Sequence, residues 1–399
     1  MQKTTLWLVA GLAIGCTNGS STSEDPAASG PGLSGDDGEG TEAGDDPDAG
    51  GVTSGDDPGG DDSGIPDDAD DPDDSGGAVF DLGNGDPVDP PCESEGPIPP
   101  PLGEMGTLAA PFASMYTAHD LGPIAGIPDP LGGTVLSLAD DDVLIVVGAS
   151  ESIDAALFEV PITRDNCGHI LSLGAATHRI DVPYADANLL HAPGGLLMSQ
   201  FPVAGLAQER ATGVVTTDLA PLGIAGPLVT STPGTESPGG LGVVPPWLAA
   251  AGQYRTVAYP TGQWYRLEHE LVAGAVELTA AQPTLVLDHG PGAFAYVPPE
   301  SPGFETPSMI VAEWYFGAYA PNPGSAVPSN ALDPQRVGVY EVTEDGDPIV
   351  ETRRDFFETI VRPWGAYFDP VSGDFVFLSW NQMPDRVTVV RGFSPPPAG

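Results

Sequence analysis

The stretch VLSLADDDVLIVVG, residues 135–148, holds two apolar runs separated by a turn that contains three consecutive aspartates. Short runs rich in Val, Ile and Leu, bounded by turn residues, are typical of paired antiparallel strands. The same arrangement recurs four more times: an apolar strand, a turn that begins with Pro or Asp, and a second apolar strand. The recurrences are NLLHAPGGLLMS (188–199), LGVVPPWLAAAGQYRTVA (241–258), AFAYVPPESPGFETPSMIVAE (293–313) and AYFDPVSGDFVFLS (366–379).

The spacing of these stretches identifies a repeat. One turn residue from each, Asp141, Pro193, Pro246, Pro299 and Asp369, gives separations of 52, 53, 53 and 70 residues. A third apolar run follows most of the hairpins, and the longer last interval contains GAYAPNPGSAVPSNALDPQ (317–335), which we interpret as an inserted loop. A period near 50 residues with three or four strands per unit is typical of a β-propeller, where a ring of small sheets closes one core.

The sequence therefore predicts an all-β fold, a β-propeller over residues 92–399 with five blades. A sixth blade would form if residues 100–125 paired with the C-terminal strands, and a β-sandwich with long loops is the structural alternative. The Pro- or Gly-containing turn before each apolar strand loosely resembles the propellers of NHL-repeat and gluconolactonase-like proteins. That resemblance implies an architecture and no particular activity.

The charge of this body restricts its partners. Residues 92–399 carry 35 acidic residues against 11 arginines, and the whole chain has a net charge of −45. A body this acidic repels phosphate backbones, so nucleic acid is a poor partner. It also repels anionic lipid, so any attachment to a membrane has to come from a different part of the chain.

The N-terminus has the features of an export signal. Lys3 precedes an apolar run over residues 6–15, which is too short to span a bilayer as a helix. The run leads into LAIGC (12–16), which resembles the lipobox of bacterial lipoproteins. The resemblance implies that residues 1–15 are a cleaved signal peptide and that Cys16 carries the lipid. The alternative is a free or buried Cys16 at the end of an uncleaved segment.

The residue after Cys16 bears on the destination of the protein. An Asp at this position would resemble the signal that retains Gram-negative lipoproteins in the inner membrane. Here the residue is Thr17, which favours the outer membrane. Two or more acyl chains anchor a protein stably, whereas one anchors it only marginally. We therefore expect a lipid-anchored protein of the cell envelope, in the outer membrane of a Gram-negative bacterium.

The segment between the lipid anchor and the propeller is strongly biased. Residues 17–91 are almost entirely Asp, Gly, Ser, Pro, Glu, Thr and Ala, with 22 acidic residues and no Lys, Arg or His. Such a segment buries too little apolar surface to offset its ordering entropy. Residues 16–91 are thus predicted to be the lipidated Cys followed by a disordered acidic stalk, spanning about 50 Å. Weak binding of a divalent cation such as calcium to its Asp runs is the alternative.

Two cysteines remain for the body, Cys92 and Cys167. An exported protein meets an oxidising compartment, where a lone pair of cysteines is more often bridged than free. The sequence predicts a Cys92–Cys167 disulfide that pins the start of the body to the first blade. The alternative is two unpaired cysteines that lie too far apart to bond.

Candidate catalytic residues are scattered, because the chain has no P-loop, GxGxxG, HExxH, CxxC or GxSxG motif. His191 and His289 both occur as His-x-Pro-Gly; they would share a metal, act as acid and base, or merely cap turns. His119 lies beside Asp120, which would orient its ring if the two faced each other. Glu313 interrupts an apolar strand and would be a channel carboxylate if it points inward, or an edge charge if outward.

Aromatic residues offer a second kind of site. Tryptophans recur along the blades, at Trp247, Trp264, Trp314, Trp364 and Trp380. Exposed on one face they would stack on sugars or anchor a protein partner, and buried between blades they would fill the core.

Two functions are compatible with these patterns. The first is a membrane-tethered envelope lipoprotein whose propeller binds or scaffolds an extracytoplasmic ligand, such as a glycan or a protein. The second is an exported propeller enzyme, a lyase, lactonase or glycan hydrolase, with a divalent metal in the central channel. If the scattered candidates met at one channel mouth, the enzyme would be favoured.

The lipid anchor is directly testable. We expect Cys16→Ala to move the protein from the membrane fraction to the soluble fraction, because the thiol that receives the lipid is gone. Fractionation and immunoblotting of cells that express either chain measure the effect. A Cys16→Ala chain that stays in the membrane fraction would contradict the anchor.

Overall fold

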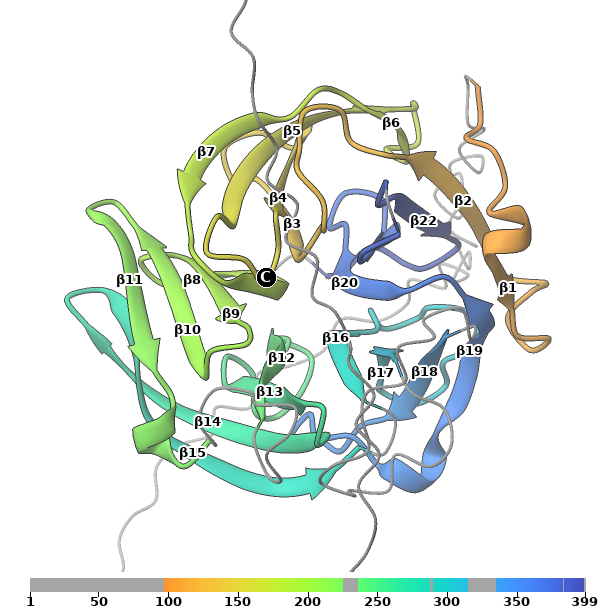
Figure 1. The fold of residues 1–399 in the computed structure, drawn as a ribbon. Helices are drawn as coiled ribbons and strands as arrows, with labels where there is room; N and C mark the ends of the chain where they lie inside the picture. Colours follow the sequence, from red (N-terminus) through yellow and green to blue (C-terminus); the bar gives the residue numbers. More distant parts are fainter. Residues whose placement is uncertain (1–96, 225–235, 288–289, 315–334, 383, 398–399) are drawn as a thin grey trace, which may run out of the picture. The chain divides into compact units, whose positions relative to one another are not determined.

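The computed structural model describes residues 97–224, 236–287, 290–314, 335–382 and 384–397. Over these ranges the chain forms antiparallel sheets arranged as five blades around one axis (Figure 1). The predicted all-β propeller is confirmed, and the alternative of a β-sandwich is wrong. The predicted signal peptide (1–15), the stalk (16–91) and the inserted loop up to residue 334 lie outside the described residues.

Each blade is one sheet whose first strand lies closest to the axis. Blade one contains β3 (Thr134–Leu136), β4 (Val143–Gly148), β5 (Ala156–Arg164), β6 (Ile170–Leu173) and β7 (Thr177–Asp181). Blade two contains β8 (Ala185–Ala192), β9 (Gly195–Gln200), β10 (Gly205–Arg210) and β11 (Gly213–Asp218). Blade three contains β12 (Ser237–Val243), β13 (Tyr254–Tyr259), β14 (Gln263–Val272) and β15 (Ala275–Val286).

The last two blades each include a strand from the start of the body. Blade four contains β16 (Pro291–Tyr296), β17 (Ser308–Glu313), β18 (Gln335–Glu341), β19 (Arg354–Ile360) and, at its outer edge, β1 (Gly106–Leu108). Blade five contains β20 (Pro363–Phe368), β21 (Phe375–Ser379), β22 (Val387–Arg391) and β2 (Thr117–Gly122). Short 3-10 helices lie at η1 (Gly103–Met105), η2 (Ala220–Leu222) and η3 (Val350–Thr352). Each of the five repeated stretches forms the two innermost strands of one blade.

The pairing of β2 with β22 closes the ring. Ala118 lies opposite Val390 in this antiparallel pair, and β2 is the outermost strand of blade five. The predicted pairing of residues 100–125 with the C-terminal strands therefore occurs, but the prediction of a sixth blade from it is wrong. Those residues complete the fifth blade, because three C-terminal strands alone leave that sheet one strand short of its neighbours.

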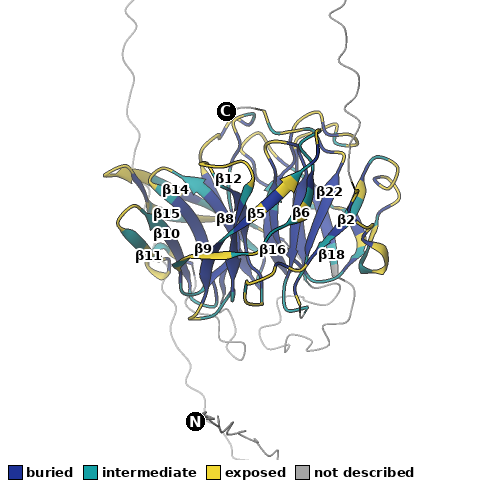
Figure 2. Cartoon of the chain, turned by 90° about the horizontal axis from the view of Figure 1, so that it is seen from above, coloured by how far each residue is buried: buried dark blue, intermediate teal, exposed yellow. Residues whose placement is uncertain are grey.

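The core lies between the blades, and β4 shows why the apolar runs in the sequence are continuous. Leu144 and Val146 pack against blade five, whereas Ile145 and Val147 pack against blade two. Successive residues of a strand point to opposite faces, so a strand buried on both faces is apolar throughout. Figure 2 shows this burial in the interior strands, with exposed residues mainly in the loops.

Glycines allow the five innermost strands to meet at the axis. A Cβ atom on Gly365 of β20 would lie 2.3 Å from the carbonyl oxygen of Gly132, just before β3. A Cβ atom on Gly240 of β12 would lie 2.4 Å from the carbonyl oxygen of Gly292 in β16. Neighbouring inner strands thus touch backbone to backbone, which leaves little room at the axis for side chains.

An ion pair fixes the closing strand. Asp120 of β2 is buried; its Oδ1 accepts the backbone N–H of Gly122 at 2.9 Å and the Nε–H of Arg386 at 3.0 Å. We expect Asp120→Ala to lower the free energy of unfolding by about 1–3 kcal/mol, because it leaves buried donors unpaired. Urea denaturation measures this.

The matched control is Asp181→Ala, which removes an exposed carboxylate paired with His178 at the surface. We expect a change within about 0.5 kcal/mol there. Equal effects of the two substitutions would show that Asp120 does not hold the ring closed.

Candidate functional site

Two of the predicted candidates, His119 and Asp120, lie on β2, at the outer edge of blade five. The Nδ1 atom of His119 lies 2.9 Å from the carbonyl oxygen of Pro99, and burial lowers the pKa of the ring. Asp120 pairs with Arg386, as described above. Both side chains therefore join the closing strand to its neighbours, away from the axis.

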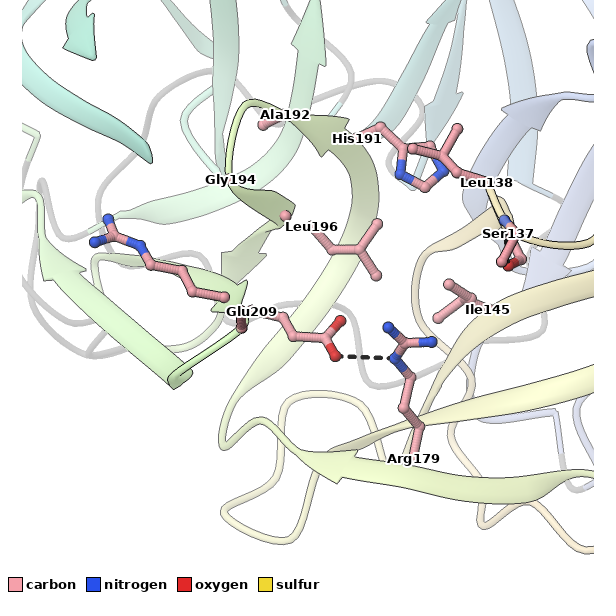
Figure 3. Close-up of a pocket in the computed structure, with 13 residues that line it drawn as sticks. Ser137, Leu138, Ile145, Arg179, His191, Ala192, Gly194, Leu196 and Glu209 are labelled. Carbon is pink, nitrogen blue, oxygen red and sulfur yellow. Dashed lines mark hydrogen bonds and ion pairs between the residues drawn. The ribbon is translucent and has the colours of Figure 1, made fainter. Parts of the chain in front are cut away.

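His191 is the penultimate residue of β8 and lines a groove of 490 Å³ between blades one and two (Figure 3). Its Nε2–H donates to the carbonyl oxygen of Leu136 at 2.6 Å, so the ring ties the first strand of blade two to that of blade one. The groove also contains Arg179, whose guanidinium is held by Glu209 at 2.9 Å and Glu159 at 2.8 Å. His289 lies outside the described residues.

Glu313 of β17 is fully buried inside blade four. Its Oε1 accepts the hydroxyl proton of Tyr340 at 2.6 Å and the Nε–H of Arg353 at 2.9 Å. Because β17 is the second strand of its blade, this carboxylate faces its own sheet neighbours and not the axis. The structure does not bring the described candidates His119, Asp120, His191 and Glu313 to one channel mouth.

The predicted disulfide stays a prediction, because Cys92 lies outside the described residues. Cys167 lies in the turn between β5 and β6, in blade one as expected, and is partly buried. Its backbone N–H donates to Asp165 Oδ1 at 2.9 Å.

A different pair of acidic residues lies at the axis. Asp186, near the start of β8, is completely buried, and its Oδ1 accepts the Nε1–H of Trp364 at 2.8 Å. Trp364 belongs to β20, so this bond crosses the axis from blade five to blade two. The Oδ2 atom of Asp186 receives no hydrogen bond from any conventional donor among the described residues. Its neighbour is the carboxyl group of Glu151.

The loop between β4 and β5 places Glu151 over Asp186. Ala149 and Glu151 both adopt positive φ angles, 50° and 65°, which residues other than glycine rarely do. The backbone N–H of Glu151 donates to Ala185 at 2.9 Å, and Ser150 Oγ donates to the same carbonyl oxygen at 3.3 Å. Backbone strain of this kind concentrates at functional sites. The strained backbone around Glu151 therefore marks this loop as part of a candidate functional site.

The two carboxyl groups share a proton. Burial raises the pKa of Asp186 to about 8, and burial together with the charge of Asp186 raises the pKa of Glu151 well above its usual range. Two neighbouring carboxyl groups, one of them completely buried, do not both ionise near neutral pH. The hydrogen bond between them therefore has one protonated carboxyl group as its donor.

Aromatic rings surround this pair at the end of the axis where the inner strands begin, which we call the entry end. Trp314 and Trp380 each lie 5.1 Å, centroid to centroid, from a tryptophan neighbour, and Trp364 lies 5.9 Å from Tyr259. Phe201 lies 5.7 Å from Tyr259. Blades two to five thus contribute rings, and blade one contributes Glu151.

The tryptophans divide between the two alternatives that the sequence left open. Trp264 and Trp364 are buried, whereas Trp247, Trp314 and Trp380 are partly exposed. The Nε1–H of Trp380 is buried without a hydrogen-bond partner among the described residues. The entry end therefore presents the partly exposed rings of Trp314 and Trp380 and the partly exposed carboxyl group of Glu151, with Asp186 buried beneath it.

Part of this site has a sequence signal. In ADANLL (185–190), Asp186 and Asn188 are polar residues at alternate positions of an otherwise apolar strand, so both face the axis. A search centred on histidines overlooks this pattern. Glu151 has no comparable signal, because it lies in a loop.

Among the described residues, no three His, Cys, Asp or Glu side chains are grouped as metal ligands.

The fold and this site define a five-bladed β-propeller with a carboxyl pair on its axis. No family model and no curated protein sequence matches the chain. Similar solved structures include a luciferin-regenerating enzyme, at 10% identity and a TM-score of 0.39 over 76% of this chain and 98% of that one. The gluconolactonase XC5397 from Xanthomonas campestris has 13% identity and a TM-score of 0.38 over 76% and 91%.

A fructofuranosidase from Schwanniomyces occidentalis is similar at 9% identity and a TM-score of 0.39, over 71% of this chain and 58% of that one. These likenesses carry no argument about activity at such identities, and the blade count rests on the strand pairing itself. Within the described ranges, no helix has the length and apolar character that crossing a bilayer requires.

The shared proton predicts a pH-dependent difference in stability. The pKa of Asp186 in the folded chain lies above the value of 3.8 for a free side chain. Between about pH 4 and 8 the folded chain therefore binds more protons than the unfolded chain. The free energy of unfolding thus falls as the pH rises through this window. Asp186→Asn keeps the shape and the donor of the neutral acid. We expect it to match the wild type at pH 4 and to be about 1–3 kcal/mol more stable at pH 8.

Urea denaturation at pH 4, 6 and 8 measures this difference. Asp154→Asn, which changes an exposed carboxyl in the same loop region, is the control and should follow the wild type at every pH. A constant difference between Asp186→Asn and the wild type across the window would contradict the shared proton.

Proposed function

We propose that the chain is a lipid-anchored protein of a bacterial cell envelope, in the outer membrane, whose propeller binds a neutral glycan at the entry end. The observation that carries this proposal is the set of rings around Glu151 and Asp186. Sugar rings present apolar C–H faces and a rim of hydroxyls. The partly exposed indole faces of Trp314 and Trp380 would pack against the first, and the carboxyl group of Glu151 would hydrogen-bond the second.

Charge and architecture support the same ligand class. The body carries a large excess of acidic residues over arginines, which disfavours anionic polymers and leaves neutral glycans acceptable. A long acidic segment between Cys16 and the body would hold the propeller away from the membrane, where it would meet a ligand in the periplasm or outside the cell. The carboxyl pair is preorganised before the ligand arrives, because the loop over residues 149–151 already holds it.

The second candidate is an exported propeller enzyme, a lyase, lactonase or glycan hydrolase. The observation that favours it is the shared proton, since a carboxyl with a pKa near 8 is a general acid at neutral pH. A glycan hydrolase uses two carboxyl groups about 5–9.5 Å apart, on either side of the scissile bond. Glu151 and Asp186 are hydrogen-bonded to each other and lie closer than that, which favours binding over hydrolysis.

A glycan array probed with the full chain tests the proposal. We expect binding to neutral glycans, and we expect Trp380→Ala to weaken it at least about tenfold, because it removes a partly exposed ring. Trp380→Phe keeps a ring and should weaken binding less.

The matched control is Trp247→Ala, which removes a partly exposed tryptophan at the other end of the axis and should leave the affinity unchanged. Absence of binding to any neutral glycan, or equal losses for Trp380→Ala and Trp247→Ala, would overturn the proposal. Mass spectrometry of the bound glycan after incubation separates the candidates, since new products would establish the enzyme.

A further inference from the structure

The opposite end of the axis, where the inner strands finish, contains a second site. A cavity of 280 Å³ opens there and is lined by residues of the innermost strand of every blade. Val135 comes from β3, Leu190 from β8, Leu241 from β12, Ala295 from β16 and Tyr367 from β20. Trp247 and Pro396 add to its wall from outside the inner strands.

The polar groups near this cavity are largely used within the protein. Tyr296 donates its hydroxyl proton to Gly346 at 2.7 Å, and His191 donates to Leu136 as described. Asn188 lies at the inner end, where its Oδ1 accepts the N–H groups of Leu241 at 3.0 Å and Phe294 at 3.4 Å. Its Nδ2 has a single long contact, 3.5 Å, to Phe294, which leaves an N–H donor for a guest.

We propose that this cavity binds a neutral, largely apolar small molecule of about the size of a bicyclic aromatic, with one hydrogen-bond acceptor at its inner end. An apolar cavity of about 150 Å³ is enough to bind benzene, and this one is nearly twice as large. The net negative charge of the body disfavours an anionic guest. The acceptor pairs with Asn188, and the rings pack against Trp247, Tyr367 and the aliphatic walls.

The C-terminal segment forms one side of the site. Phe393 is buried against Tyr116, with ring centroids 4.3 Å apart, so the chain is anchored just before its prolines. Pro396, three residues later, then contributes an apolar ring to the cavity wall. A proline-rich segment loses little entropy when it is held in place, which suits it to form a fixed wall.

Calorimetric titration of the full chain with 2-naphthol, in detergent-free buffer, tests the site. We expect saturable binding of one molecule per chain, and binding of naphthalene about 2–10-fold weaker, because naphthalene lacks the acceptor for Asn188. Ala295→Leu fills the cavity and should weaken 2-naphthol binding at least about tenfold. Ala295→Val fills less of it and should give an intermediate loss.

The matched control is Ala211→Leu, the same substitution in the exposed turn between β10 and β11, which should bind 2-naphthol as the wild type does. Thermal unfolding of each variant confirms that it is folded. Non-saturable binding, more than one site per chain, no binding to the folded wild type, or unchanged affinity in both Ala295 variants would each overturn the proposal.

Discussion

The close approach of five backbones at one axis is the constraint on which this molecule depends. Gly132, Gly240, Gly292 and Gly365 bring neighbouring inner strands within contact distance, and a side chain at these positions would push the blades apart. A five-membered ring of sheets has a narrow centre, so only a few side chains can occupy it. Asp186, Asn188 and Trp364 do so, and they link blade two to blades three, four and five across the axis.

One acidic pair lies at this narrow centre and lacks the partner that several other buried carboxylates have. Glu313 pairs with Arg353, and Asp347 pairs with Arg255. Among the described residues Asp186 forms no ion pair with an arginine, and it is stabilised by an indole N–H and by a proton shared with Glu151. A paired arginine stays protonated throughout the ordinary pH range, whereas a proton shared between two carboxyl groups makes a site responsive to pH.

The two ends of the axis differ in chemistry because the inner strands run in the same direction. Their starts carry Asp186 and Trp364, and their ends carry Leu190 and Phe368, with Asn188 between them. A polar, aromatic entry end and an apolar cavity therefore lie at opposite ends of the inner strands. The glycan and the apolar guest proposed here would occupy opposite ends, so either can be present without the other.

The blades can be predicted from the amino-acid sequence, because the 52- and 53-residue repeat of apolar hairpins follows from local strand and turn preferences. The sequence also placed the strand pairing at the C-terminus, although not that this pairing completes the fifth blade. Which polar residues meet depends on the tertiary fold. Glu313 pairs with Arg353 within its own blade, whereas Glu151 bonds to Asp186 across the interface between blades one and two. Such pairs depend on how the blades pack and on which face of a strand a residue occupies. The residues adjacent in the sequence determine neither.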